Sequence, residues 1–217
     1  MSAQKKMPMQ KEKHTVSGSA EKDTKETFDL PKCIRVLTLA PEMALAALTL
    51  LFVYRPAMFA GALDYAMALL FLTVFPLLAY PLQPLLPKFR DAGRRGQRRL
   101  AIIMAVAGYL FGILYALFAH VSRELLLVYL GYLLSGALIA LFNRTFAIRA
   151  SGYACGVAGP VAFLYVFFGP RALWGLGVLA LVYWASLRMK RHTVSQLLWG
   201  SVLPVGAVWL AQELLLR

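Results

Sequence analysis

Long apolar segments alternate with short polar ones along most of the chain, and this pattern predicts membrane-spanning helices. An α-helix rises about 1.5 Å per residue and the hydrocarbon core of a bilayer is about 30 Å thick, so roughly 17 to 25 apolar residues make one crossing. Seven segments reach or approach this length, the fifth and sixth only by including Gly, Pro or Arg at an end. We therefore predict an all-α, polytopic transmembrane bundle of about six to seven spans, near residues 36–54, 62–80, 100–120, 125–142, 150–168, 170–187 and 197–215.

The first 31 residues have a different composition, rich in Lys, Glu, Ser and Thr with few apolar side chains. Such a segment buries too little apolar surface to offset the entropy of ordering, and it contains no apolar stretch of the length that a signal peptide needs. We predict a retained, disordered polar tail at 1–31, two N-terminal transmembrane helices within 32–80, and a larger transmembrane core at 81–217.

Composition and charge agree with a membrane protein. The chain is 60% hydrophobic and only 15% charged, which is outside the usual range of soluble domains, and its net charge is +13. The 23 Lys and Arg residues fall into alternate loops on one predicted side, with four exceptions: Arg55, Arg123, Arg171 and Arg217. The positive-inside rule then places the N-terminus and the basic loops in the cytoplasm, although a phosphate-binding face would concentrate the same residues.

These basic residues separate apolar spans and form no basic domain of their own, so nucleic acid is not a predicted partner. The predicted partner is a membrane lipid or a lipid phosphate. The two cysteines, Cys33 and Cys155, lie far apart in sequence, and we predict neither a disulfide nor a metal site from them. No cofactor is predicted, and the oligomeric state is left open.

One histidine lies among cationic neighbours, in the segment RMKRHTVSQ at residues 188–196. If the last span begins near this segment, His192 and Gln196 are four residues apart on one face of a helix. The Gln196 carbonyl can then accept a hydrogen bond from one ring nitrogen, which fixes the tautomer and leaves the other nitrogen free as a nucleophile.

Two further basic segments should meet the His192 segment at the same side of the membrane, because two spans separate each of the three from the next. One contains Arg149, Ser151 and Gly152 at the start of the fifth span, where free helix amides favour an anion. The other, at residues 88–99, has the sequence KFRDAGRRGQRR.

Taken together, the three segments resemble the type 2 phosphatidic acid phosphatase superfamily, which shares its helical core with vanadium haloperoxidases. That family uses three motifs of the forms KxxxxxxRP, PSGH and SRxxxxxHxxxD. The third motif places its nucleophile on His192 and the residue that orients it on Gln196, and the second matches at Ser151 and Gly152. The first fits loosely on Lys88 and Arg95, with Gly96 in place of proline.

Two motif residues are substituted, which makes the chain a degenerate member of that superfamily if the resemblance holds. Tyr153 replaces the histidine that acts as general acid, and Ser186 replaces the arginine of the third motif, with Arg188 two residues further on. Tyrosine has a reference pKa of about 10 and is a poor proton donor near neutral pH.

The resemblance implies a membrane phosphatase that acts on a lipid phosphate or an isoprenoid diphosphate through a phosphohistidine, without a metal. It implies catalytic roles for His192, Gln196 and Tyr153. It also implies a phosphate-binding group made of Lys88, Arg95, Arg149, Ser151, Gly152, Arg188 and Arg191.

Two alternatives stay open. The substituted residues favour a catalytically inactive relative that binds anionic lipid or a membrane partner. A small transporter or an unrelated scaffold would be favoured if His192 and Arg95 were distant in the fold. Geometry separates these cases, because the phosphatase hypothesis requires the three basic segments to converge.

Overall fold

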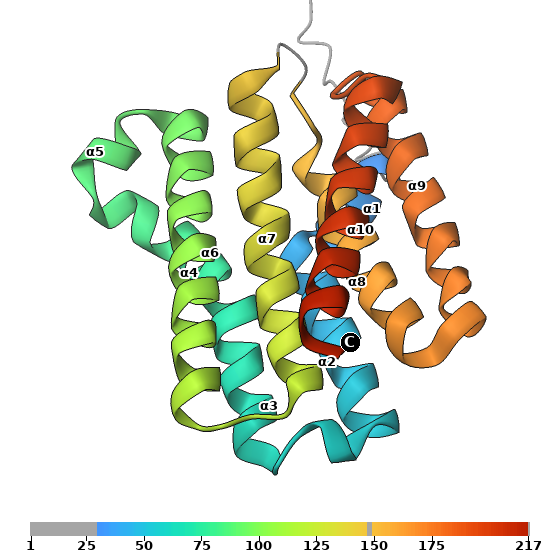
Figure 1. Ribbon diagram of the computed structural model, residues 1–217. Helices are drawn as coiled ribbons and strands as arrows, with labels where there is room; N and C mark the ends of the chain where they lie inside the picture. Colours follow the sequence, from blue (N-terminus) through green and yellow to red (C-terminus); the bar gives the residue numbers. More distant parts are fainter. Residues whose placement is uncertain (1–29, 147–148, 217) are drawn as a thin grey trace, which may run out of the picture.

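A computed structural model describes residues 30–146 and 149–216, and within these ranges the chain is helical with no strands (Figure 1). Residues 1–29 of the predicted tail lie outside the described residues, whereas Leu30 and Pro31 already belong to the first helix. The helices are α1 Leu30–Leu37, α2 Ala40–Tyr54, α3 Ala62–Leu69, α4 Phe75–Leu82, α5 Pro87–Arg90, α6 Gly93–Phe118, α7 Arg123–Thr145, α8 Gly152–Phe168, α9 Gly175–Arg188 and α10 Val194–Leu216. Three short 3-10 helices among the described residues are η1 Pro56–Met58, η3 Gln83–Leu85 and η4 Gly169–Trp174, and η2 Leu70–Val74 is a π-helical turn.

Five of the described helical stretches are long and apolar enough to cross a membrane, and α2 is a shorter apolar helix. The stretch from Gly152 to Arg188 contains two of the predicted spans, because the chain reverses at η4 and α9 packs back against α8 (Figure 1). Gly169 begins that reversal with a positive φ of 63°, a backbone conformation that favours glycine. The structure therefore agrees with the predicted all-α, multi-pass membrane architecture. The five stretches are Ala62–Leu85, Gly93–Phe118, Arg123–Thr145, Gly152–Arg188 and Val194–Leu216.

The start of the first predicted span was wrong. We expected a continuous helix from Val36, but α1 ends at Leu37 and α2 begins at Ala40. Pro41 is the second residue of α2, and a proline there lacks an N–H and collides with the carbonyl four residues earlier, so α1 cannot continue into α2. The break allows α1 to pack against α9, and this packing brings Arg35 to the end of the bundle where α9 ends.

Helix α7 lies at the centre of the bundle and packs most extensively against α10, with further contacts to α6 and α8. Tyr129 and Phe163 are among the largest fully buried side chains. Glycines allow α6 to approach its neighbours closely: at Gly108 an added Cβ would overlap the Phe71 carbonyl, and at Gly112 it would overlap the Tyr129 ring.

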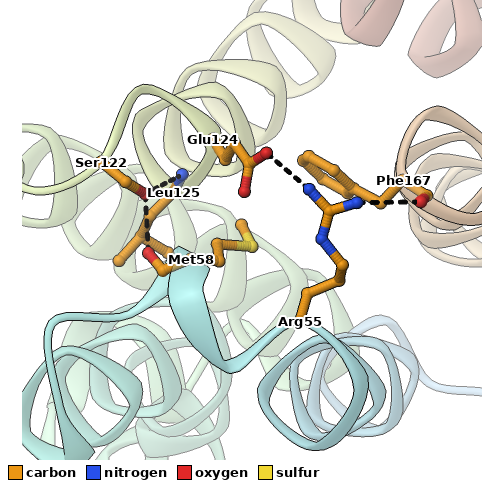
Figure 2. Close-up of polar contacts among 6 residues, drawn as sticks. All are labelled: Arg55, Met58, Ser122, Glu124, Leu125 and Phe167. Atoms are coloured by element: carbon orange, nitrogen blue, oxygen red, sulfur yellow. Dashed lines mark hydrogen bonds and ion pairs between the residues drawn. The ribbon is translucent and has the colours of Figure 1, made fainter.

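At one end of the bundle, polar contacts connect α2, α7 and α8 (Figure 2). Arg55 contacts the Glu124 carboxylate at 2.7 Å and donates to the Phe167 carbonyl at 3.4 Å. Close by, the Ser122 hydroxyl donates to the Met58 carbonyl at 2.6 Å and caps α7. Three of the four cations outside the basic side, Arg55, Arg123 and Arg171, lie at this end (the fourth, Arg217, is outside the described residues), and the three basic segments lie at the other.

Asp64, which the sequence places inside an apolar span, is buried near that same end. Its carboxylate accepts hydrogen bonds from the Tyr115 hydroxyl at 2.6 Å and the Ala60 N–H at 2.9 Å. These bonds satisfy the carboxylate within the protein, so Asp64 has a structural explanation.

Candidate functional site

The start of α8 and the start of α10 are joined directly by their backbones. The Ser151 N–H donates to the Gln196 carbonyl at 2.8 Å. Gly200 makes this contact possible, because an added Cβ would overlap the backbone nitrogen and oxygen of Ser151. On the other side of Ser151, the Ala150 N–H donates to the Asn143 side chain at 2.6 Å, which ties α8 to the end of α7.

His192 lies in the short turn between two well-formed helix ends. At the end of α9, the Arg191 N–H donates to the Ser186 carbonyl at 3.0 Å and the Lys190 N–H donates to the Leu187 carbonyl at 2.9 Å. Lys190 has a positive φ of 51°, so this is a Schellman-type termination with lysine where glycine is usual. The turn ends one residue before His192, so the imidazole is held close to the end of α9.

The beginning of α10 is closed by a reciprocal capping box. The Thr193 hydroxyl accepts from the Gln196 N–H at 3.4 Å, while the Gln196 side-chain oxygen accepts from the Thr193 N–H at 3.3 Å. The same oxygen lies 3.1 Å from His192 Nδ1. Because a carbonyl oxygen only accepts, Nδ1 carries the proton and Nε2 keeps its lone pair. The predicted contact between His192 and Gln196 is present, but His192 lies in the turn before α10 and not on a face of that helix.

Three arginines from different parts of the chain act electrostatically on His192: Arg35 of α1, Arg98 of α6 and the adjacent Arg191. The imidazole is half-buried, and its pKa is lowered from the ordinary value of 6.5. Burial is the largest cause. The hydrogen bond to Gln196 acts in the opposite direction, and the three cations lower the pKa further. His192 is therefore neutral near pH 7.

Tyr153 and Ser151 lie beside this group, in the first turn of α8 and at its N-cap. The guanidinium of Arg35 lies 4.2 Å from the centre of the Tyr153 ring, a cation–π contact. The fully buried Ser151 hydroxyl accepts from the Ala154 N–H at 3.4 Å, so it caps α8. Arg35 thus connects the Tyr153 and His192 parts of the site.

The remaining predicted residues lie either at the same end of the bundle as His192 or at the edge of the bundle. The side chains of Arg149, Arg188 and Arg191 are exposed at the same end of the bundle as His192, as is Gly152. Arg95 is exposed in the first turn of α6, one turn before Arg98. Lys88 lies in α5 at the edge of the bundle, on the side of α6 away from α10, so it is apart from His192 and its phosphate contact stays a prediction (Figure 1).

Two substituted positions have local explanations. Gly96 is buried against α5, where an added Cβ would overlap the Phe89 carbonyl, so glycine allows α5 to pack on α6. Ser186 is fully buried and its hydroxyl has no hydrogen-bond partner among the described residues. An arginine at position 186 would be buried here, whereas Arg188 is exposed.

Sequence reasoning did not select Arg35 or Arg98. Arg98 belongs to the basic segment at 88–99. If that segment is treated as a helix, Arg98 lies one turn after Arg95 on the same face, and this spacing could have selected it. Arg35 was assigned to the residues before a span. Only the break before Pro41 separates it into α1 and allows it to reach the site.

Comparisons with protein-family models, with curated proteins and with solved structures found no match for the chain. The interpretation of the site therefore depends on its own geometry. That geometry is a neutral imidazole with one oriented nitrogen, cations from three segments, and a helix N-terminus, all at one end of the bundle.

Replacing Arg35 with glutamine is expected to raise the pKa of His192, because it removes a positive charge that disfavours the imidazolium. Imidazole NMR of the full-length protein in detergent measures this. In the unmodified protein the His192 signal should titrate below pH 6.5. Arg123→Gln, at the exposed start of α7 at the other end, is the control and should leave the titration unchanged. An identical midpoint in Arg35→Gln and the unmodified protein would contradict this placement of Arg35.

Proposed function

We propose that the chain is a membrane phosphatase-like hydrolase that removes phosphate from an anionic lipid, through a phosphohistidine formed on His192. One observation supports this most strongly. The Gln196 oxygen holds Nδ1, which leaves the lone pair of Nε2 outside that contact, and the charges of Arg35, Arg98 and Arg191 act on the same ring. A neutral imidazole with a fixed tautomer is a nucleophile, and the surrounding cations attract the phosphate that it would attack.

The proposed reaction has two steps. The Nε2 lone pair forms a bond to phosphorus while the bond from phosphorus to the leaving oxygen breaks, and the leaving group takes that electron pair. Water then attacks the phosphohistidine, which releases orthophosphate and restores the imidazole. The guanidinium groups of Arg35 and Arg98, whose charges act on His192, would neutralise charge on the phosphoryl oxygens.

The groups beside His192 favour a substrate with a good leaving group. An alkyl phosphate such as phosphatidic acid expels an alkoxide, which needs a proton from an acid with a pKa near neutrality. A tyrosine is a poor proton donor near neutral pH, and the ring of Tyr153 is in contact with the Arg35 guanidinium. A diphosphate instead expels a phosphate monoester, whose second pKa is about 6. We therefore propose an isoprenoid diphosphate rather than phosphatidic acid as the substrate class.

The test is orthophosphate release by purified full-length protein in detergent, with undecaprenyl diphosphate and phosphatidic acid supplied separately. Release from the diphosphate is expected to be at least about tenfold faster, since alkoxide departure lacks the general-acid contribution of about 10²-fold or more. Equal rates would contradict the leaving-group argument. No release from either lipid would contradict the proposed hydrolase.

A second candidate function is binding of anionic lipid without turnover. The contact between Arg35 and Tyr153 favours it, because the position of the expected acid is occupied by a neutral ring under a cation. This candidate predicts saturable binding to vesicles that contain phosphatidic acid, with no orthophosphate released. Tyr153→His should then restore release, because it places an acid of suitable pKa at the start of α8.

We also propose that the basic end of the bundle faces the cytoplasm. The described cations of the three basic segments lie together at that end, as the positive-inside rule expects. A topology reporter fused to Met1 tests this, and a reporter signal from the outer side would contradict it.

A further inference from the structure

A groove with a volume of about 770 Å³ lies between α8, α9 and α10. Nearly all of its lining is apolar, and neither acidic nor basic side chains contribute to it. In Figure 1 the lower part of α9 and the η4 turn lie away from α10. Representative lining residues are Ala158, Tyr165, Leu176, Val202, Gly206 and Trp209.

The groove lies below the candidate site along the same two helices. The turn that carries His192 connects α9 to α10, and the Tyr183 and Ser201 hydroxyls are hydrogen-bonded at 2.9 Å between the turn and the groove. At a rise of about 1.5 Å per residue, Ser201 lies about 14 Å below His192 along α10, and Gln212 lies about 30 Å below it. The groove therefore occupies the half of the membrane away from the site.

We propose that this groove holds the far part of the hydrocarbon chain of the lipid whose phosphate lies at His192, and that the chain is a long polyprenyl chain. This inference rests on the proposed function. The groove lining contains no cation that could bind the headgroup of a lipid anchored at the opposite end, whereas the charges of Arg35, Arg98 and Arg191 act on His192. Charge thus assigns the headgroup to one end and the chain to the groove.

Length assigns the kind of chain. An extended chain with C–C bonds of about 1.5 Å advances about 1.3 Å per carbon, so about 11 carbons reach Ser201 from His192 and about 23 reach Gln212. A ten-carbon prenyl chain ends before the groove. A polyprenyl chain of several tens of carbons is long enough to fill it.

Gly206 offers a direct test, because it lines the groove and an added Cβ there meets no atom within 4 Å. In Gly206→Phe, the new phenyl ring should occupy the groove without displacing a helix. The matched control is Gly177→Phe on α9. An added Cβ at Gly177 also meets open space, but Gly177 does not line the groove. The measurement is KM and kcat for undecaprenyl diphosphate and for geranyl diphosphate, with the full-length protein in detergent.

In Gly206→Phe we expect KM for undecaprenyl diphosphate to rise about tenfold, equivalent to about 1.4 kcal/mol, with the geranyl diphosphate constants unchanged. Gly177→Phe should match the unmodified protein for both. An unchanged KM for the long chain, or an equal rise for both chains, would overturn the assignment of the groove.

Crosslinking separates failure of the groove from failure of the hydrolase. A polyprenyl monophosphate with a photoreactive group near the end of its chain should label peptides of α8, α9 or α10, and Gly206→Phe should abolish that labelling. The labelling pattern can be measured even if the protein releases no phosphate. Labelling of other helices, or equal labelling by the uncharged polyprenol, would overturn the link between groove and site.

Discussion

Replacing His192 with alanine is expected to lower phosphate release by about 10³-fold or more, because it removes the only group with a free, oriented lone pair at the described site. The substitution leaves the fold largely intact, since the imidazole is half-buried in a turn and the backbone bonds of α9 and α10 do not involve its side chain. The unmodified protein should also form an acid-labile, base-stable phosphoprotein with radiolabelled substrate, and His192→Ala should not.

The matched control is His120→Ala. His120 is exposed at the opposite end of the bundle, after α6, so its removal should change neither the rate nor the phosphoprotein. A rate in His192→Ala within about tenfold of the unmodified protein would exclude a phosphohistidine mechanism, since loss of a nucleophile costs far more.

The second large effect is expected at Gly200, where α10 touches the backbone of Ser151. In Gly200→Ala the new Cβ overlaps the Ser151 nitrogen and oxygen, which are backbone atoms and cannot rotate away. The start of α8 must move, and the hydrogen bond from Ser151 to Gln196 breaks. Overpacking of this kind costs about 1 to 3 kcal/mol, so both the melting temperature and phosphate release should fall.

Melting in detergent and phosphate release measure this prediction, with Gly177→Ala as the control. Position 177 is on α9 outside the groove lining and its added Cβ meets open space, so that variant should behave like the unmodified protein. If Gly200→Ala melted and turned over like Gly177→Ala, the contact between α8 and α10 would not position the site.

The helices were predictable from the sequence because the length of each apolar run and the polarity of the loops beside it are local properties of the chain. The predicted boundary between the spans at 150–168 and 170–187 coincides with the reversal that begins at Gly169. The limit was at the first span, where Pro41 interrupts an apolar run that hydropathy alone would continue from Val36. That signal lies in a single residue, which hydropathy averages over. Recognising the backbone chemistry of Pro41 would have placed the break between α1 and α2.

The site was predictable where it depends on spacing and not where it depends on packing. The sequence spacing of His192 and Gln196 predicted their contact, although the structure makes it through the capping box at Thr193 and not along one face of a helix. Arg35 reaches Tyr153 only because α1 packs on α9, a tertiary contact without a local pattern. Lys88 fitted a motif spacing but belongs to α5, whose packing on α6 holds it away from His192.

The two ends of the bundle treat positive charge differently. At one end, Arg55 meets a fixed carboxylate from its own chain, Glu124 (Figure 2). At the other, Arg35, Arg98 and Arg191 all disfavour a further positive charge on His192. An incoming dianion at the basic end would offset the positive charge that these arginines contribute there, as well as making new contacts. Binding should then tighten the helix ends that carry these arginines and weaken as ionic strength screens them.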